Sequence, residues 1–308
     1  MSDLIASSVN SATKGSAGKT ACKQIVLNVS GVENDFQEPC SVGLVSLIDS
    51  ESSFAYLKSG LSKKQLFAEN LTIEGLQKTS LNLLDRLQAG SAEIQIVKRG
   101  KGCNELKCNY LSVTKSCTLA ENAYFARVTR SGIISAGDKV IHLPKVYKVV
   151  VVTLSDRASK GEYFDLSGPE AGRMISDFFE TNKLPFLIDF VLLPDDAEAL
   201  YQLITNLRDA STDLVITTGG TGIGPRDITP DVVSKLIDKQ IPGIMELIRY
   251  KYGSVKPNAL LSRSVAGVMG QTLIYTLPGS VKAVNEYLNE ILPTLKHSIY
   301  MLNELDMH

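Results

Sequence analysis

The chain has 308 residues, of which 44% are hydrophobic and 21% are charged, and its formal net charge at pH 7 is −1. This balance is typical of a globular protein, and it excludes a general nucleic-acid binder or a protein drawn to an anionic membrane surface. Residues 1–145 carry 17 Lys or Arg against 13 Asp or Glu, whereas the remaining residues carry 15 against 20. The length and the opposite signs of the two halves predict two domains, 1–145 and 146–308.

No apolar run reaches the length that crosses a bilayer, and residues 1–20 lack the charged start and apolar core of a signal peptide. We therefore expect a cytoplasmic protein with no membrane partner, and we interpret its five cysteines as reduced thiols. The segment Lys14–Thr20 ends in Gly-Lys-Thr, but Thr13 stands where a phosphate-binding P-loop needs its first glycine. A P-loop is therefore rejected.

Short apolar segments separated by turns dominate the first half. Strands are expected at 25–30, 42–49, 93–100, 110–114, 123–129 and 139–143, and helices at 54–59 and 76–87. Many short strands with few helices predict a mostly-β barrel.

Four segments of this half resemble the MOSC domain, a family named after the C-terminal part of molybdenum-cofactor sulfurase. They are FAENLTIEGL (67–76), GKGC (100–103), FARV (125–128) and SGIISAGDKV (131–140). The resemblance implies a domain that handles sulfur on a cysteine or binds the molybdenum cofactor, with Cys103 at the characteristic position. Small relatives usually carry Gly-Asp-His where this chain has Glu33–Phe36. That departure shifts the expectation from an enzyme toward a carrier.

Three interpretations of Cys103 stay open. Lys98, Arg99 and Lys101 surround it with positive charge, which favours a reactive thiolate. The thiol is alternatively a small buried core group, or a zinc ligand together with Cys108 and Cys117. The functional options for this half are persulfide transfer, a reductase-like module acting on N-hydroxylated compounds with a bound molybdenum cofactor, and cofactor docking for delivery.

Strands and helices alternate through the second half. Strands are expected at 149–154, 187–193, 213–218, 265–269 and 272–277, with helices at 169–179, 195–208, 230–238, 243–252 and 281–302. This order predicts an α/β fold with a doubly wound, mostly parallel sheet. Polar motifs directly follow four strands, at 155–157, 194–196, 217–222 and 277–280. Because ligands bind beyond the carboxyl ends of parallel strands, we expect these motifs on one rim.

The stretch TTGGTGIGPRDITPD (217–231) combines a strand end, a loop of small side chains, a carboxylate and a helix start. Backbone N–H groups of such a loop can bind an anion, and Asp227 can hold a metal ion that bridges phosphates. Thr229 and Pro230 are predicted as the N-cap and the first residue of the helix. The alternative is an ordinary glycine-rich turn with a solvated aspartate.

Six segments in order resemble the MogA/MoaB-type molybdenum-cofactor biosynthesis domain, in its molybdopterin adenylyltransferase branch. They are 155–169, 192–196, 217–231, 241–249, 260–268 and 276–284. The resemblance implies that the terminal phosphate of molybdopterin attacks the α-phosphate of ATP, with Mg²⁺ held by Asp195 and Asp227 as the functional aspartates. It implies a phosphate site at Gly219, Gly220, Thr221 and Gly222, a pocket lined by Ser155, Asp156 and Thr229, and a far side formed by Ser262, Arg263, Pro278, Gly279 and Ser280.

Other interpretations of these residues remain. Asp195 is alternatively the N-cap of the helix that it opens, and Arg157 and Arg263 are alternatively surface salt-bridge partners. The rival function is a non-catalytic module that binds and delivers molybdopterin or its cofactor. The family resemblance further implies a homotrimer and other proteins of the molybdenum-cofactor pathway as partners.

Overall fold

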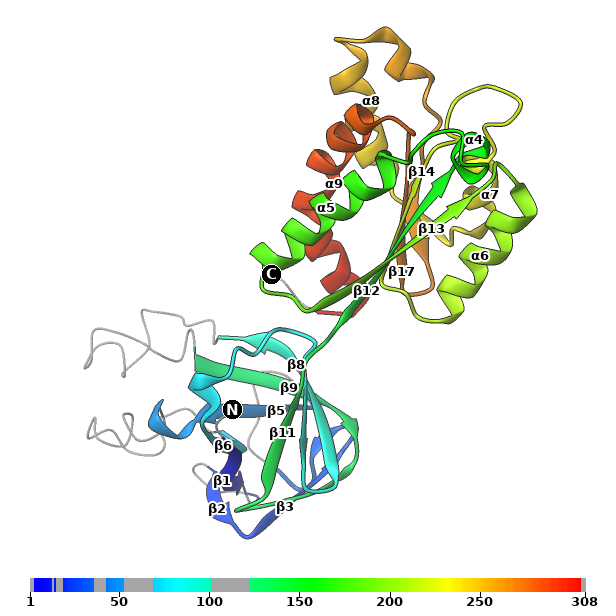
Figure 1. Ribbon diagram of the computed structural model, residues 1–308. Helices are drawn as coiled ribbons and strands as arrows, with labels where there is room; N and C mark the ends of the chain where they lie inside the picture. The colour runs from blue at the N-terminus through cyan, green and yellow to red at the C-terminus, as the bar shows by residue number, and fades with distance from the viewer. Residues whose placement is uncertain are drawn as a thin grey trace. The chain divides into compact units, whose positions relative to one another are not determined.

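The computed structural model describes residues 3–12, 14, 19–35, 43–52, 69–100 and 122–305. The chain divides into two compact units, Met1–Lys145 and Val146–His308 (Figure 1). Across the described residues, no helix combines the length and the apolar character needed to span a membrane.

Seven strands of the first unit close into a barrel. In order around the ring they are β1 (Leu4–Ser11), β6 (Leu71–Glu74), β5 (Leu44–Asp49), β9 (Ala123–Arg130), β8 (Ala92–Arg99), β7 (Arg86–Ala89) and β11 (Lys139–Leu143). The pairing of β11 with β1 closes the ring. The short strand β2 (Thr20–Cys22) extends from β1, and β3 (Gln24–Asn28), β4 (Gly31–Val32) and β10 (Gly132–Ser135) form a separate sheet. The predicted mostly-β barrel is thus confirmed.

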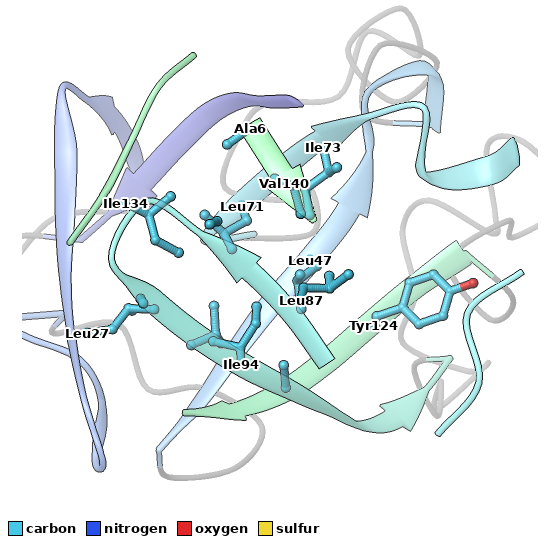
Figure 2. Close-up of a cluster of buried hydrophobic side chains, with 14 of the residues drawn as sticks. Ala6, Leu27, Leu47, Leu71, Ile73, Leu87, Ile94, Tyr124, Ile134 and Val140 are labelled. Atoms are coloured by element: carbon cyan, nitrogen blue, oxygen red, sulfur yellow. The ribbon is translucent and has the colours of Figure 1, made fainter. Parts of the chain in front are cut away.

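Aliphatic side chains from every side of the ring fill the barrel (Figure 2). Leu47, Leu87 and Ile94 are among its fully buried members. The helix predicted over 76–87 is wrong, because only η2 (Leu76–Lys78) is helical and the chain re-enters the barrel as β7. A turn intervenes in which Leu84 has a left-handed φ of 73° and Asp85 accepts a hydrogen bond from the backbone of Asn82. The leucine spacing therefore serves the barrel interior and not a helix face.

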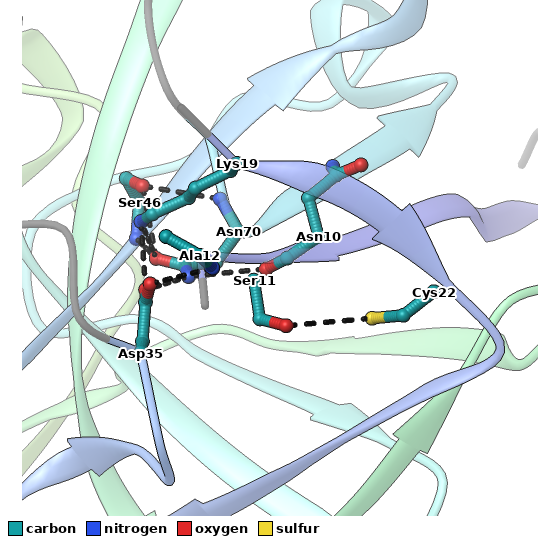
Figure 3. A network of polar contacts seen from close by, with 8 residues as sticks. All are labelled: Asn10, Ser11, Ala12, Lys19, Cys22, Asp35, Ser46 and Asn70. Carbon is teal, nitrogen blue, oxygen red and sulfur yellow. Dashed lines mark hydrogen bonds and ion pairs between the residues drawn. The ribbon is translucent and has the colours of Figure 1, made fainter. Parts of the chain in front are cut away.

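Asp35 belongs to the segment in which this chain departs from the Gly-Asp-His pattern, and it lies in a buried polar network (Figure 3). Its carboxylate lies 3.0 Å from Lys19 Nζ, with both side chains at most 10% exposed. It also accepts hydrogen bonds from the backbone of Ala12 (2.9 Å) and from Nδ2 of Asn70 (2.8 Å). Lys19, the lysine of the rejected P-loop segment, is thus part of the barrel's structure. The predicted segments 54–59 and 110–114 lie outside the described residues.

The second unit is built on a six-stranded sheet. The strand order is β13 (Phe186–Leu193), β12 (Tyr147–Leu154), β14 (Leu214–Thr218), β17 (Thr272–Leu277), β16 (Ala266–Met269) and β15 (Lys239–Gln240). The first four strands are mutually parallel, and the last two pair antiparallel. A mostly parallel sheet is therefore observed, as predicted.

Helices cover both faces of this sheet (Figure 1). α5 (Ser167–Thr181) and α9 (Val281–Leu302) pack together on one face, and α6 (Ala197–Asp209) and α7 (Thr229–Leu236) on the other. α8 (Pro242–Gly253) packs against η4 (Pro257–Leu261) and α9. The valines of β12 are buried on both sides, which explains why this strand reads as a continuous apolar run. Three short elements were not predicted, namely α4 (Asp156–Ser159), η4 and β15, because two to five residues carry no periodic pattern.

Candidate functional site

The loops that leave β12, β13, β14 and β17 meet at one edge of the sheet. The backbone N–H of Ser155 donates to Leu193 O (2.9 Å), which joins the first two loops. The N–H of Gly219 donates to Leu277 O (2.9 Å), which joins the other two. Parallel pairing thus brings together four motifs that are far apart in sequence.

Residues 219–222 are here called the glycine loop, and Gly219 and Gly220 in it are packed so closely that a side chain does not fit. Gly219 has a φ of 99°, and a Cβ there would lie 2.2 Å from a carbonyl oxygen of β12. Gly220 has a φ of 61°, and its Cβ would lie 2.6 Å from Thr229 Oγ1. The glycines are therefore required both by the left-handed backbone and by the approach of the neighbouring segments.

Thr229 stabilises the glycine loop through two hydrogen bonds. Its side chain is fully buried, its Oγ1 donates to Gly219 O (2.9 Å), and its N–H donates to Gly220 O (3.1 Å). The predicted N-cap role is wrong, since α7 begins at Thr229 itself and Ile228 is the N-cap. The hydroxyl of Thr229 makes its hydrogen bond to the glycine loop and does not cap the helix.

The glycine loop opens on a pocket of about 410 Å³. The backbone N–H groups of Gly220, Thr221 and Gly222 find no acceptor among the described protein residues. Of the residues predicted from sequence, the lining includes Gly220, Thr221, Gly222, Asp227, Ser262, Pro278, Gly279 and Ser280. It also includes residues that the sequence did not indicate, Lys256, Asn258, Ala259, Leu261, Lys282, Ala283, Glu286 and Tyr287. These come from η4 with its preceding residue and from α9, which no local motif connects to the glycine loop.

Arg263 holds the glycine loop in shape and does not line this pocket. Its Nε donates to Gly222 O (2.7 Å), its Nη2 donates to Asp227 O, and its Nη1 pairs with Asp231 (2.7 Å). On the pocket side, Ser262 accepts a hydrogen bond from Tyr287 (3.0 Å). The salt bridge with Asp231 matches the alternative interpretation of Arg263, and its contact with a ligand stays a prediction.

Asp156 and Asp195 lie next to each other at the start of α4 and α6. The N–H of Asp195 donates to Asp156 Oδ1 (3.0 Å), and the N–H of Asp156 donates to Asp195 Oδ2 (3.3 Å). The capping interpretation of Asp195 is wrong, because Asp196 is the N-cap of α6 and accepts from Ala199 N (2.8 Å). The carboxylate of Asp195 therefore does not cap α6.

The electrostatics of this acidic pair are asymmetric. The hydrogen bond from the backbone of Asp195 holds the pKa of Asp156 below its usual value, and Arg226, 2.8 Å away, adds to the effect. Burial raises the pKa of Asp195, and the negative charges of Asp156 and Asp227 act in the same direction. Asp195 is thus a partly desolvated carboxylate repelled by two others, a position that a cation would stabilise.

Ser155 and Arg157 do not line the pocket. Ser155 caps α4 by accepting from Ala158 N (3.2 Å), and its hydroxyl lies 3.0 Å from the hydroxyl of Tyr163. Arg157 lies 3.4 Å from Glu162 and stacks over the Tyr163 ring, which supports the surface interpretation. Cys103, Cys108 and Cys117 lie outside the described residues.

Comparisons with known proteins match two family models to this chain. Residues 132–297 match the model of the probable molybdopterin binding domain, and residues 45–141 match that of the MOSC domain. The chain is 37% identical over 153 residues to a molybdopterin adenylyltransferase of Helicobacter pylori, which covers 49% of this chain and 85% of the relative. It is 35% identical over 167 residues to molybdenum cofactor biosynthesis protein B of Staphylococcus carnosus, covering 53% of this chain and 95% of the relative.

Two further similarities are found. Gephyrin of Dictyostelium discoideum is 39% identical over 160 residues, which are 50% of this chain but only 22% of that protein. The crystal structure of the molybdopterin biosynthesis enzyme MoaB from Thermus thermophilus is 34% identical, with a TM-score of 0.46, and covers 52% of this chain and 98% of that one. The family model spans more than half of the 308 residues. The chain therefore belongs to the family of probable molybdopterin binding domains, here preceded by a MOSC domain.

Proposed function

We propose that the second unit is a molybdopterin adenylyltransferase. In this reaction an oxygen of the terminal phosphate of molybdopterin attacks the α-phosphate of ATP. A new P–O–P bond forms, the bond between the α- and β-phosphates breaks, and pyrophosphate leaves. The observation that carries the proposal is the position of Asp227. It lines the pocket with the glycine loop, while its neighbour Arg226 pairs with Asp156 (2.8 Å), which accepts a hydrogen bond from Asp195 outside the pocket lining. Two phosphate-bearing substrates can therefore meet at this residue.

The pocket side of Asp227 suits molybdopterin. The backbone N–H groups of the glycine loop, which lines this pocket, can donate hydrogen bonds to a phosphate. Lys256 and Lys282 add positive charge at the lining. The side that holds Asp156, Asp195 and Arg226 is then assigned to ATP, with Arg226 as an exposed cation whose side chain is 72% accessible. Holding both anions in reacting geometry is the main contribution that a protein makes to such a transfer.

The residues present fit a magnesium ion. Asp195 and Asp227 offer the hard oxygen ligands that Mg²⁺ prefers, and mutual repulsion among the carboxylates favours a cation. Within the described part of the chain, no three His, Cys, Asp or Glu side chains are arranged to hold a metal. A Mg²⁺ site ordinarily uses one or two protein carboxylates and is completed by substrate phosphates. When bound, the ion would neutralise charge on the phosphate oxygens.

Pyrophosphate release from purified protein, molybdopterin, Mg²⁺ and ATP tests the proposal. Asp227→Asn is expected to lower turnover by about 10²-fold or more while changing molybdopterin affinity far less, since its work is on charge in the transition state. Asp177→Asn, on the exposed face of α5, is the matched control and should leave turnover unchanged. Molybdopterin binding without pyrophosphate release would instead establish a non-catalytic binding and delivery module.

For the first unit we propose a role in carrying sulfur or the molybdenum cofactor on Cys103. Joining it to the second unit raises the local concentration of a shared intermediate. Mass spectrometry and metal analysis of the full chain test this: persulfide on Cys103 supports sulfur transfer, and co-purified molybdenum supports cofactor docking. A Cys103→Ser variant identical to the parent in cofactor transfer would remove the role.

We further propose a cytoplasmic homotrimer that works with other proteins of the molybdenum-cofactor pathway. The proposal rests on the family resemblance. Light scattering at micromolar protein measures the mass directly, and a monomer mass would contradict the trimer.

A further inference from the structure

Glu286 is a pocket carboxylate for which the described residues supply no hydrogen-bond donor. It lies on α9, its side chain is 22% exposed, and it lines the pocket. Its nearest cation is Lys282 at 3.6 Å, and no described group donates a hydrogen bond to it. One turn later, Glu290 accepts hydrogen bonds from Lys251 Nζ (2.7 Å) and the Tyr252 hydroxyl (2.9 Å). The carboxylate of Glu286 therefore has acceptor sites that no described donor uses, and these sites are available to a bound ligand.

The other residues that line the pocket indicate which kind of ligand would supply hydrogen-bond donors to Glu286. Ala259, Leu261, Pro278 and Ala283 give the pocket apolar surface, to which the buried side chain of Tyr287 adds. Such a surface suits a flat heterocycle. The glycine loop, in the same pocket, offers N–H donors to a phosphate. The pocket thus combines sites for a planar ring, for an anion and for a group that presents hydrogen-bond donors.

An ionised carboxylate accepts two parallel hydrogen bonds from adjacent donors and donates none. The 2-amino-4-oxopyrimidine edge of a pterin presents such a pair, its 2-amino group and N3–H. We infer that Glu286 determines specificity in this pocket by binding that edge of the pterin. The inference rests on the proposed function in placing molybdopterin here. The hydroxyl pair of a nucleotide ribose is the other source of two adjacent donors, and the experiment separates the two.

The test compares pterin with lumazine, in which an oxo group replaces the 2-amino group, by fluorescence titration of the full chain without ATP or metal. Wild type is expected to prefer pterin, because the 2-oxo group of lumazine places acceptor against acceptor. Glu286→Gln should weaken pterin binding by about 10- to 100-fold and remove the preference, as for loss of hydrogen bonds to a charged group. Glu290→Gln is the matched control on the same helix, and it should keep both the affinity and the preference. ATP affinity, measured separately, should be unchanged in both variants.

Several outcomes would overturn the inference. These are equal affinity of wild type for pterin and lumazine, no pterin binding at all, or full pterin affinity in Glu286→Gln. Loss of ATP affinity in place of pterin affinity would assign Glu286 to the ribose. The wild-type comparison needs no variant and is therefore independent of any folding defect. A pterin preference that depends on Glu286, in a protein that releases no pyrophosphate, would refute the proposed function and leave this inference standing.

Discussion

Replacing Thr229 with valine tests whether the glycine loop is held by a side-chain hydroxyl. Valine keeps the shape of threonine, so no cavity forms, but it cannot donate to Gly219 O, which the hydroxyl contacts at 2.9 Å. The site is fully buried, so water does not replace the bond without rearrangement. Losing a buried hydrogen bond and leaving its carbonyl unsatisfied costs about 1–3 kcal/mol.

For a unit of this size, that loss corresponds to a fall in melting temperature of about 2–10 °C. Thr229→Ser is the matched control, because it keeps the hydroxyl and loses only a methyl group, which costs about 0.8 kcal/mol. Thermal unfolding followed by circular dichroism measures stability, and molybdopterin titration reports on the loop. We expect Thr229→Val to lose both stability and affinity, and Thr229→Ser to lose little of either. If the valine variant melts with the parent, or the serine variant is the less stable of the two, the hydroxyl does not hold the loop.

Two further substitutions test the backbone and the charge of the site. Gly219→Ala should lower the free energy of unfolding by about 2 kcal/mol or more, from left-handed strain and steric overlap with β12. Gly243→Ala, where an added Cβ meets no atom within 4 Å, should not, as denaturant titration can show. Burial raises the pKa of Asp195, so its contribution to stability is present below the ordinary carboxyl pKa and is lost as the pH rises through the raised value. Asp195→Asn should therefore melt higher than the parent at neutral pH, with the gain shrinking in acid, while losing turnover; a lower melting temperature at neutral pH would contradict the burial argument.

The sequence by itself determined the architecture of the second unit and the edge of the sheet on which its candidate site lies. Buried parallel strands carry continuous β-branched runs, and the long helices carry a 3.6-residue period, so both are visible locally. The glycine loop was also visible, because a chain that must turn left-handed against its neighbours tolerates little but glycine at Gly219 and Gly220. Since parallel strands end at one edge, the order of motifs placed them on a common rim.

Tertiary structure alone decided which group each side chain contacts. Leu81, Leu84 and Leu87 have a spacing that also fits a helix, but in the folded chain all three are buried, and Leu81 and Leu87 belong to the core of the barrel. Neighbouring aspartates in the PDD motif look alike in sequence, yet the geometry at the start of α6 gives the cap to Asp196 and leaves Asp195 to the site. The two aspartates are adjacent in the chain, and only the packing of α6 decides which of them is the N-cap.

Some residues on the far wall of the pocket likewise could not be predicted from the sequence. Lys256 precedes η4, and Glu286 and Tyr287 lie on α9, where the sequence shows only one face of an amphipathic helix. They reach the pocket because α8, η4 and α9 pack together beside the loop that follows β17. Such a contact depends on where whole helices pack, a property that no local pattern of residues encodes.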